Sequence, residues 1–230
     1  MYLSKIMFRA GNASHQALLH IQQKGSYASH QLLWTLFPKQ EQRHFLFRED
    51  KSDGGRSGVG MPEYLLLSAT PPKIDSEFFS VKSKHFSPQL SVGDRLAFRL
   101  RANPTVSITS NSKTARGKRH DVMMHAKTTA RRDGVTDPQQ LYQYMNQAAL
   151  DWLMDPRRRT EWGIDFDVQP NVVASYQHQA MKRHHAIRYT SVDYEGILTV
   201  RDPAKLLTVL AQGVGRSKAF GCGLLLLRRI

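Results

Sequence analysis

An alternation with a period of two in residues 94–108, DRLAFRLRANPTVSI, most constrains the fold. Leu96, Phe98 and Leu100 fall on one face of the pattern, and three arginines fall on the other. Such alternation is typical of a strand with one buried face, and Asn103-Pro104 interrupts it. The chain therefore builds at least one sheet that has a packed side and a charged side.

The first half of the chain combines further strands with one clear helix. Leucines and a phenylalanine recur at helical spacing within residues 26–38, and Pro38 marks the end of that helix. Residues 10–25 are polar and only partly compatible with a helix. The expected strands are 1–9, 43–50, 63–70, 77–86 and 94–108. This order suits an α+β domain of the ferredoxin-like or RRM-like kind, although no second helix is evident.

The second half has a similar composition of elements. Residues 136–156 predict a helix with Asp137 as its N-cap and Pro138 at its first position. A pair of strands around a basic tip follows. A short helix at 202–213 comes next, with Asp202 as its cap and Pro203 at its first position, and a final apolar strand ends the pattern. We therefore expect two α+β domains, at 1–108 and 121–230, joined by a basic linker at 109–120.

The charge balance favours a polyanionic partner. Of the 230 residues, 33 are Lys or Arg and 19 are Asp or Glu, which gives a net charge of +14 and a pI near 10.1. A merely basic protein is the alternative.

The single cysteine, Cys222, excludes an internal disulfide and a cysteine-based zinc site. No signal-like or membrane-spanning apolar run is present, so we expect a cytoplasmic protein.

A glycine-rich, cationic stretch, GVGRSKAFGCGLL, occupies residues 213–225. Glycines let a backbone approach a ligand closely, and successive amides can cradle a phosphate. The spacing matches neither a Walker A loop nor a dinucleotide-binding fingerprint. A tight connection from helix to strand, with Cys222 as a small packed residue, is the alternative interpretation.

The same stretch resembles the C-terminal signature of the RAMP superfamily of CRISPR-associated RNA-processing proteins. YEGILTVRDPAKLLTVLAQGVG at 194–215 is similar to one branch, CasE, which comprises the crRNA-processing endoribonucleases of the type I-E Cascade complex. MYLSK at 1–5, HQLLWTLFP at 30–38 and FRLRANP at 98–104 agree with that branch in the same order.

The resemblance implies two tandem ferredoxin-like domains and a metal-independent endoribonuclease without a cofactor. It implies binding of a CRISPR repeat hairpin and cleavage at the base of the stem by 2′-hydroxyl attack, leaving a 2′,3′-cyclic phosphate. It also implies retention of the product with other Cascade subunits. His30 occupies the position of the family's catalytic histidine, as general acid or base. Tyr27, three residues earlier, shares its helical face and would hold a phosphate oxygen or position the hydroxyl.

Basic clusters supply candidates for RNA contact, since duplex RNA is recognised mostly through its shape and backbone charge. Arg157–Arg159 follows a helix, where cations also satisfy terminal carbonyls. Lys182 or Arg183 is also a candidate for stabilising the reacting phosphate. The predicted RNA-binding residues are Lys113, Arg116, Lys118, Arg119, Arg131, Arg132, Lys182, Arg183, Gly213, Gly215, Arg216, Ser217, Lys218, Gly221 and Gly223.

Two alternatives remain open from the sequence: a non-catalytic crRNA-binding subunit of the same superfamily, and a basic structural protein of a ribonucleoprotein. The histidines at 120, 125, 178, 184 and 185 match no zinc signature. Trp34, Phe37 and Trp152 lie at helical spacing among leucines, which predicts core positions.

Overall fold

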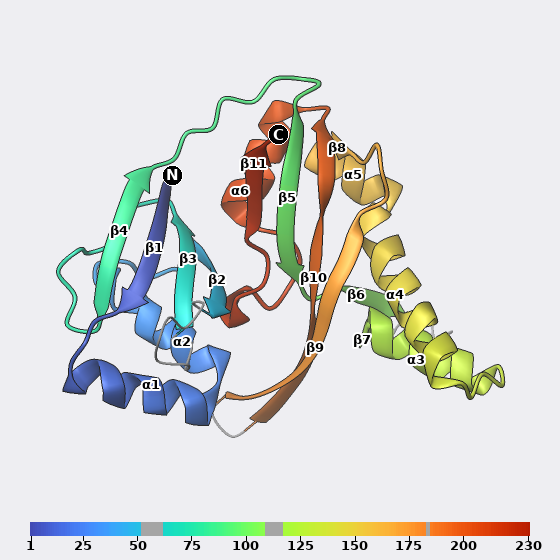
Figure 1. Cartoon of the computed structure of the whole chain (residues 1–230), viewed down its shortest axis with the longest axis horizontal. Helices are drawn as coiled ribbons and strands as arrows, with labels where there is room; N and C mark the ends of the chain where they lie inside the picture. The colour runs from blue at the N-terminus through green and yellow to red at the C-terminus, as the bar shows by residue number, and fades with distance from the viewer. Residues whose placement is uncertain (52–61, 109–116, 183–184) are drawn as a thin grey trace. The chain divides into compact units, whose positions relative to one another are not determined.

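The computed structural model describes residues 1–51, 62–108, 117–182 and 185–230 (Figure 1). The chain forms two compact units. The first comprises 1–89, 179–188 and 210–224, and the second comprises 90–178, 189–209 and 225–230. Both units combine helices with antiparallel strands, as the alternation in the sequence predicts.

The first unit is built on a four-stranded sheet in the order β2-β3-β1-β4. Every neighbouring pair in this sheet is antiparallel. β1 and β2 therefore run in the same direction with β3 between them, and α1 and α2 form the crossover that joins them (Figure 1). The bounds are β1 Tyr2–Phe8, α1 Asn12–Lys24, α2 Ser26–Trp34, β2 Phe45–Lys51, β3 Pro62–Ser68 and β4 Phe79–His85.

The core of this unit forms between α2 and the sheet. Leu33 of α2 and Leu36 of the turn that follows supply one side, and alternate residues of the strands supply the other side, as a half-buried sheet requires. The buried cluster is Ile6, Leu33, Leu36, Phe37, Phe45, Phe47, Tyr64, Leu66 and Phe79. Trp34 packs against this cluster, so the predicted core roles of Trp34 and Phe37 are confirmed.

The second unit contains a sheet in the order β11-β5-β10-β8, with β9 also paired to β10, and a separate β6–β7 pair. No helix in the described part of the chain has the length and apolar character needed to cross a membrane. The strands are β5 Arg95–Ala102, β6 Thr105–Ile108, β7 Lys118–Asp121, β8 Ile164–Asp165, β9 Asn171–Lys182, β10 His185–Val200 and β11 Leu225–Arg229. The helices are α3 Val122–Arg132, α4 Pro138–Met154, α5 Pro156–Trp162 and α6 Pro203–Gln212, and the 3₁₀ turn η1 is Lys218–Phe220.

The arginine face of β5 carries a row of ion pairs with carboxylates of the same unit. Arg101 donates two hydrogen bonds of 2.8 Å to Asp193 across the β5–β10 pair. Arg99 lies 3.8 Å from Glu195, and Arg95 lies 3.3 Å from Asp167. We call these three pairs the arginine–carboxylate row. It shows that the charged side predicted for this strand is largely neutralised.

The helix caps predicted for the second half are confirmed. The Asp137 carboxylate accepts a hydrogen bond from the backbone N–H of Gln140 at 2.8 Å, and Pro138 opens α4. Asp202 likewise accepts from the backbone N–H of Lys205 at the start of α6. The sequence gives no clear signal for α3, which begins after the N-cap Asp121 and buries little beyond Met123 and Ala130.

The observed units depart from the expected boundary at 109–120. β5, which we expected in the first domain, pairs with β10 and β11 instead. Residues 210–224 and 179–188 belong to the first unit, although they come late in the chain. The departure arises because apolar strands pair with partners distant in sequence, which a boundary drawn along the chain does not capture.

Replacing Leu33 with alanine tests whether α2 is held by its core face. Leu33 has 0% exposure, so Leu33→Ala should lower the free energy of unfolding by about 2–5 kcal/mol. Urea denaturation measures this change. The neighbouring exposed residue is the control: Gln31→Ala should shift the free energy by no more than about 0.5 kcal/mol. Equal losses in both variants would contradict this packing.

Candidate functional site

His30 lies on α2 within a cluster of aromatic rings. Its ring centroid is 5.5 Å from those of Trp34 and Phe45, and 6.1 Å from that of Phe47. The residue is half-buried, and its Nε2 atom is shielded from solvent. Phe45 and Phe47 alternate along β2 so that both face the helix. The imidazole is therefore held between α2 and the sheet while the residue stays partly exposed.

Tyr27 and His30 share one face of α2, as their spacing predicts. Their rings stack with centroids 6.2 Å apart and planes inclined by 29°. Tyr27 also packs against Phe220 of η1, at a centroid distance of 5.8 Å. The structure thus brings together the two predicted catalytic residues and the glycine-rich loop, all within the first unit.

A buried hydrogen-bonded relay fixes the rotation of α2 against the sheet. The Tyr64 hydroxyl donates to Ser29 Oγ at 3.2 Å, and Ser29 Oγ donates to Glu49 Oε2 at 3.0 Å. Burial raises the pKa of Tyr64, and the nearby Glu49 carboxylate raises it further, so the phenol stays protonated and can donate. Because Ser29 precedes His30, this relay also sets the direction of the imidazole.

The glycine-rich loop, residues 213–224, packs along β2. A Cβ at Gly213 would lie 2.6 Å from a methyl carbon of Leu46, and one at Gly221 would lie 3.3 Å from the ring of Phe47. The loop closes on itself where Val214 N–H donates to the Gly223 carbonyl at 2.8 Å. Gly213, Gly221 and Gly223 therefore do serve to pack a tight connection from helix to strand, which is the alternative interpretation of these glycines. Cys222 is fully buried, as expected for a packed residue.

Cations gather at the same loop. Lys218 Nζ donates to the Gln212 carbonyl at 2.8 Å. Burial lowers the pKa of Lys218, and the charge of Arg43 lowers it further. Gly215 and Arg216 are exposed, and Ser217 has φ of +57°, a left-handed conformation that is uncommon for residues other than glycine. Alternating left-handed residues in a loop orient backbone amides toward an anion.

The other predicted RNA-binding residues belong to different parts of the chain. Lys118 and Arg119 are exposed on β7, and Arg131 and Arg132 are exposed in the last turn of α3, all in the second unit. Lys182 is the last residue of β9. Lys113, Arg116 and Arg183 lie outside the described residues.

Arg158 satisfies a carbonyl at the end of α4, as the helix-end interpretation predicts, whereas Arg159 pairs with a carboxylate. The Arg158 guanidinium lies 4.1 Å from the centre of the Trp152 ring and donates to the Trp152 carbonyl at the end of α4. Trp152 in turn stacks with Tyr194. Arg159 donates to Asp165 at 2.6 Å. The backbone N–H of Phe166 lowers the pKa of the Asp165 carboxyl, and the bond from Arg159 lowers it further.

Sequence reasoning missed the residues that frame the site. Phe45 and Phe47 were recognised only as strand residues, although their period of two placed both on the face that meets α2. No sequence pattern indicates that Phe220 and Arg43 belong to the site, because their roles depend on the loop folding back onto β2 from the far end of the chain. Among the described residues no three His, Cys, Asp or Glu side chains are grouped as a metal site would require.

The arrangement provides an imidazole that can accept or donate a proton near neutral pH, a phenol beside it and a cationic loop. It defines an α+β protein that carries a histidine–tyrosine pair next to a glycine-rich, cationic loop. A family model described as CRISPR associated protein matches residues 1–229. The chain therefore belongs to this family of CRISPR associated proteins.

Particular relatives cover nearly the whole chain. It is 30% identical over 227 residues to the CRISPR system Cascade subunit CasE of Escherichia coli strain K12, with 98% of each chain covered. The crystal structure of Cas6e from Escherichia coli K-12 is 28% identical, with all of both chains covered and a TM-score of 0.65. Thermus thermophilus Cse3 bound to an RNA representing a pre-cleavage complex shares the fold, with 24% identity, a TM-score of 0.69, and 99% and 98% of the two chains covered.

Replacing Gly223 with alanine tests the packing of the loop. Its φ is +94°, and a Cβ would lie 2.6 Å from the Val214 carbonyl oxygen. Gly134 is a matched control, since its φ is +91° and nothing lies within 4 Å of the added Cβ. Gly134→Ala should cost about 1 kcal/mol for the backbone conformation, and Gly223→Ala about 1–3 kcal/mol more. Urea denaturation of both variants measures the difference, and equal costs would refute the close contact.

Proposed function

We propose that this protein is the endoribonuclease subunit that processes CRISPR repeat RNA. The main support for this proposal is that His30 and Tyr27 lie together on α2 beside the cationic loop, in a chain 30% identical along its length to the Cascade subunit CasE. The net charge of +14 supports a polyanionic substrate. The substrate is the stem-loop of the repeat, cut at the base of the stem.

The proposed reaction is a transesterification within the RNA strand. The 2′-hydroxyl oxygen attacks the adjacent phosphorus while its proton passes to a base. The bond from phosphorus to the 5′-oxygen breaks, and that oxygen receives a proton. The products are a 2′,3′-cyclic phosphate and a 5′-hydroxyl, so no water is consumed and no metal is required for the proton transfers.

His30 carries one of these proton transfers, as base toward the 2′-hydroxyl or as acid toward the leaving oxygen. Its aromatic neighbours limit the access of water, which strengthens electrostatic interactions at the reacting phosphate. Tyr27 donates a hydrogen bond to a phosphate oxygen or orients the hydroxyl. The cations of the loop offset the negative charge that develops on phosphorus. Lys182 or Arg183 is a further candidate for that task.

The fold supports two ferredoxin-like units. In the first unit, the first strand β1 lies between the third and fourth strands, β3 and β4. In the second unit, β5 lies in the same way between β10 and β11. The second unit has helices in both crossovers, whereas residues 69–78 of the first unit join β3 to β4 without a helix. The helix that a ferredoxin-like pattern places between its third and fourth strands is therefore absent from the first unit, and the helix that the sequence only partly indicated, α1, belongs to the crossover between β1 and β2.

RNA binding is proposed to involve both units. Exposed cations on β7 and α3 suit recognition of a duplex by backbone charge, and the loop suits the region of the cut. The processed RNA stays bound, and the protein acts in the cytoplasm with other Cascade subunits. The residues proposed to contact RNA are Lys113, Arg116, Lys118, Arg119, Arg131, Arg132, Lys182, Arg183, Gly213, Gly215, Arg216, Ser217, Lys218, Gly221 and Gly223.

The alternative is a crRNA-binding subunit that does not cut. It would share the charge and the loop, but it would not need an imidazole and a phenol stacked on one helical face. The two functions are separated by whether the purified wild-type protein cleaves the repeat hairpin at all.

His30→Ala should reduce the single-turnover cleavage rate by about 10²–10⁴-fold, because it removes the proton-transfer group. Affinity for the hairpin should stay within a few-fold. His20→Ala is the matched control, since His20 is exposed on α1 of the same unit and should leave the rate unchanged. A wild-type protein that binds the hairpin but never cuts it would establish the non-catalytic alternative.

The same assay tests the nucleophile and the metal independence. Cleavage in EDTA should proceed at the rate seen without chelator, and a 2′-deoxy residue before the scissile phosphate should abolish it. End-group analysis should detect the cyclic phosphate. Loss of cleavage in EDTA would refute the metal-free mechanism, and cleavage of the deoxy RNA would refute 2′-hydroxyl attack.

Tyr27→Phe separates the phenolic hydroxyl from the ring. The ring contact with Phe220 is retained, so η1 should stay packed on α2, while the cleavage rate falls by up to about 10²–10³-fold. Single-turnover kinetics and urea denaturation measure the two effects. An unchanged cleavage rate would show that Tyr27 serves only to pack η1 against α2.

A further inference from the structure

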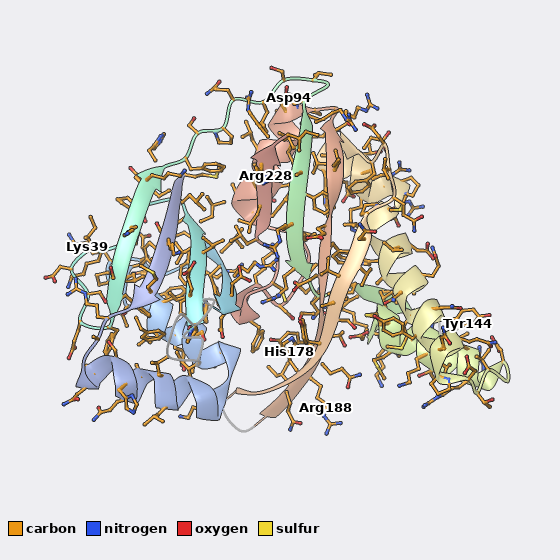
Figure 2. The ribbon with its side chains drawn as sticks, viewed as in Figure 1. Lys39, Asp94, Tyr144, His178, Arg188 and Arg228 are labelled. Carbon is orange, nitrogen blue, oxygen red and sulfur yellow. The ribbon has the colours of Figure 1, made fainter. Side chains whose placement is uncertain are left out.

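A row of aromatic rings lies on the β9–β10 pair of the second unit. The ring of His178 stacks on that of Tyr189 with centroids 4.6 Å apart and planes inclined by only 16°. Tyr176 follows, at 6.4 Å from His178. We call Tyr176, His178 and Tyr189 the aromatic row. Figure 2 labels His178 within it.

The inner end of the row is rigidly held. Tyr189 is 8% exposed, and His178 Nε2 shares a hydrogen bond of 2.7 Å with Ser191 Oγ, a group that is itself 1% exposed. Burial lowers the pKa of His178, and the charge of Arg101 lowers it further, so the ring is neutral near pH 7. A neutral imidazole that is held by this hydrogen bond can stack on aromatic rings, and it gives the outer ring, that of Tyr176, a defined position.

The outer end of the row is open to solvent. Tyr176 is 51% exposed, although it carries a large aromatic surface. The next residue, Gln177, contacts Met124 of α3 on the other side of the strand, so Tyr176 and His178 face away from that helix. Two other exposed tyrosines, Tyr142 and Tyr144 on α4, make no ring contact with described residues. Tyr176 differs from these two tyrosines because its ring lies beside that of His178, which in turn stacks on Tyr189.

We propose that the aromatic row is a stacking platform for an unpaired nucleobase of the bound RNA. Proteins bind single-stranded RNA by stacking splayed-out bases on aromatic side chains, and each stacked base contributes about 1–3 kcal/mol. Arg101 lies close enough to influence His178 but is held by Asp193, so the surface is aromatic rather than strongly cationic. Such a surface fits the face of a base better than a phosphate. This inference rests on the proposed function.

The test compares two uncleavable RNAs that carry a 2′-deoxy residue at the cut site. One is the repeat hairpin from the organism's own CRISPR array with its single-stranded flanks, and the other is the stem-loop alone. Wild type should bind the flanked RNA more tightly. Tyr176→Ala should weaken binding of the flanked RNA by about 5- to 150-fold, which is the stacking energy converted to affinity, and leave the stem-loop affinity unchanged.

Two further variants sharpen the result. Tyr176→Trp keeps a large π-face and should retain the preference for flanks, whereas Tyr142→Ala removes a tyrosine of similar exposure, 52%, and should change neither affinity. Fluorescence of 2-aminopurine placed along the flanks should locate the quenched, stacked base in wild type and lose that quenching in Tyr176→Ala.

The outcomes separate the inference from the proposed function. If wild type binds both RNAs equally, or if Tyr176→Ala weakens both to the same extent, the platform is refuted while RNA binding stands. An effect of Tyr142→Ala equal to that of Tyr176→Ala would also refute it. If wild type binds neither RNA, the proposed function itself fails.

Discussion

The packing of α2 against β2 and β3 is the interaction on which the candidate site depends. Leu33 of α2 and Leu36 of the turn that follows are buried against the sheet, and the Tyr64–Ser29–Glu49 relay sets the rotation of the helix. A helix held by apolar contacts alone could rotate between neighbouring grooves, whereas a buried hydrogen-bonded relay has few satisfactory geometries. The relay therefore converts a packed helix into one that presents His30 and Tyr27 in a fixed direction.

The glycine-rich loop serves the same arrangement from the far end of the chain. Its glycines permit close approach to Leu46 and Phe47 on β2, and Phe220 then reaches Tyr27. Packing and ligand approach are not competing explanations for these glycines. The contacts that seat the loop on β2 are also what place Arg216, Ser217 and Lys218 in the unit that contains the imidazole.

Much of the local structure was readable from the sequence. Period-two alternation identified β5, and Asp137-Pro138 and Asp202-Pro203 located the starts of two helices, because strand faces and helix caps are local features. The pairing of β5 with β10 and β11 was not readable, since it joins segments that lie far apart in the sequence, as in the pairs Arg95–Thr199 and Leu96–Arg229. For the site, the three-residue spacing of Tyr27 and His30 predicted a shared face. Phe220 and the Ser29 relay required the three-dimensional fold.

The arginine–carboxylate row changes how the net charge of the molecule should be counted. Arg95, Arg99 and Arg101 are each close to a carboxylate of the same unit, so they contribute little free positive potential. Counterion release on binding a nucleic acid depends on the cations that meet phosphates, not on the formal total. The steepness with which affinity falls as ionic strength rises should accordingly report fewer charges than the composition suggests.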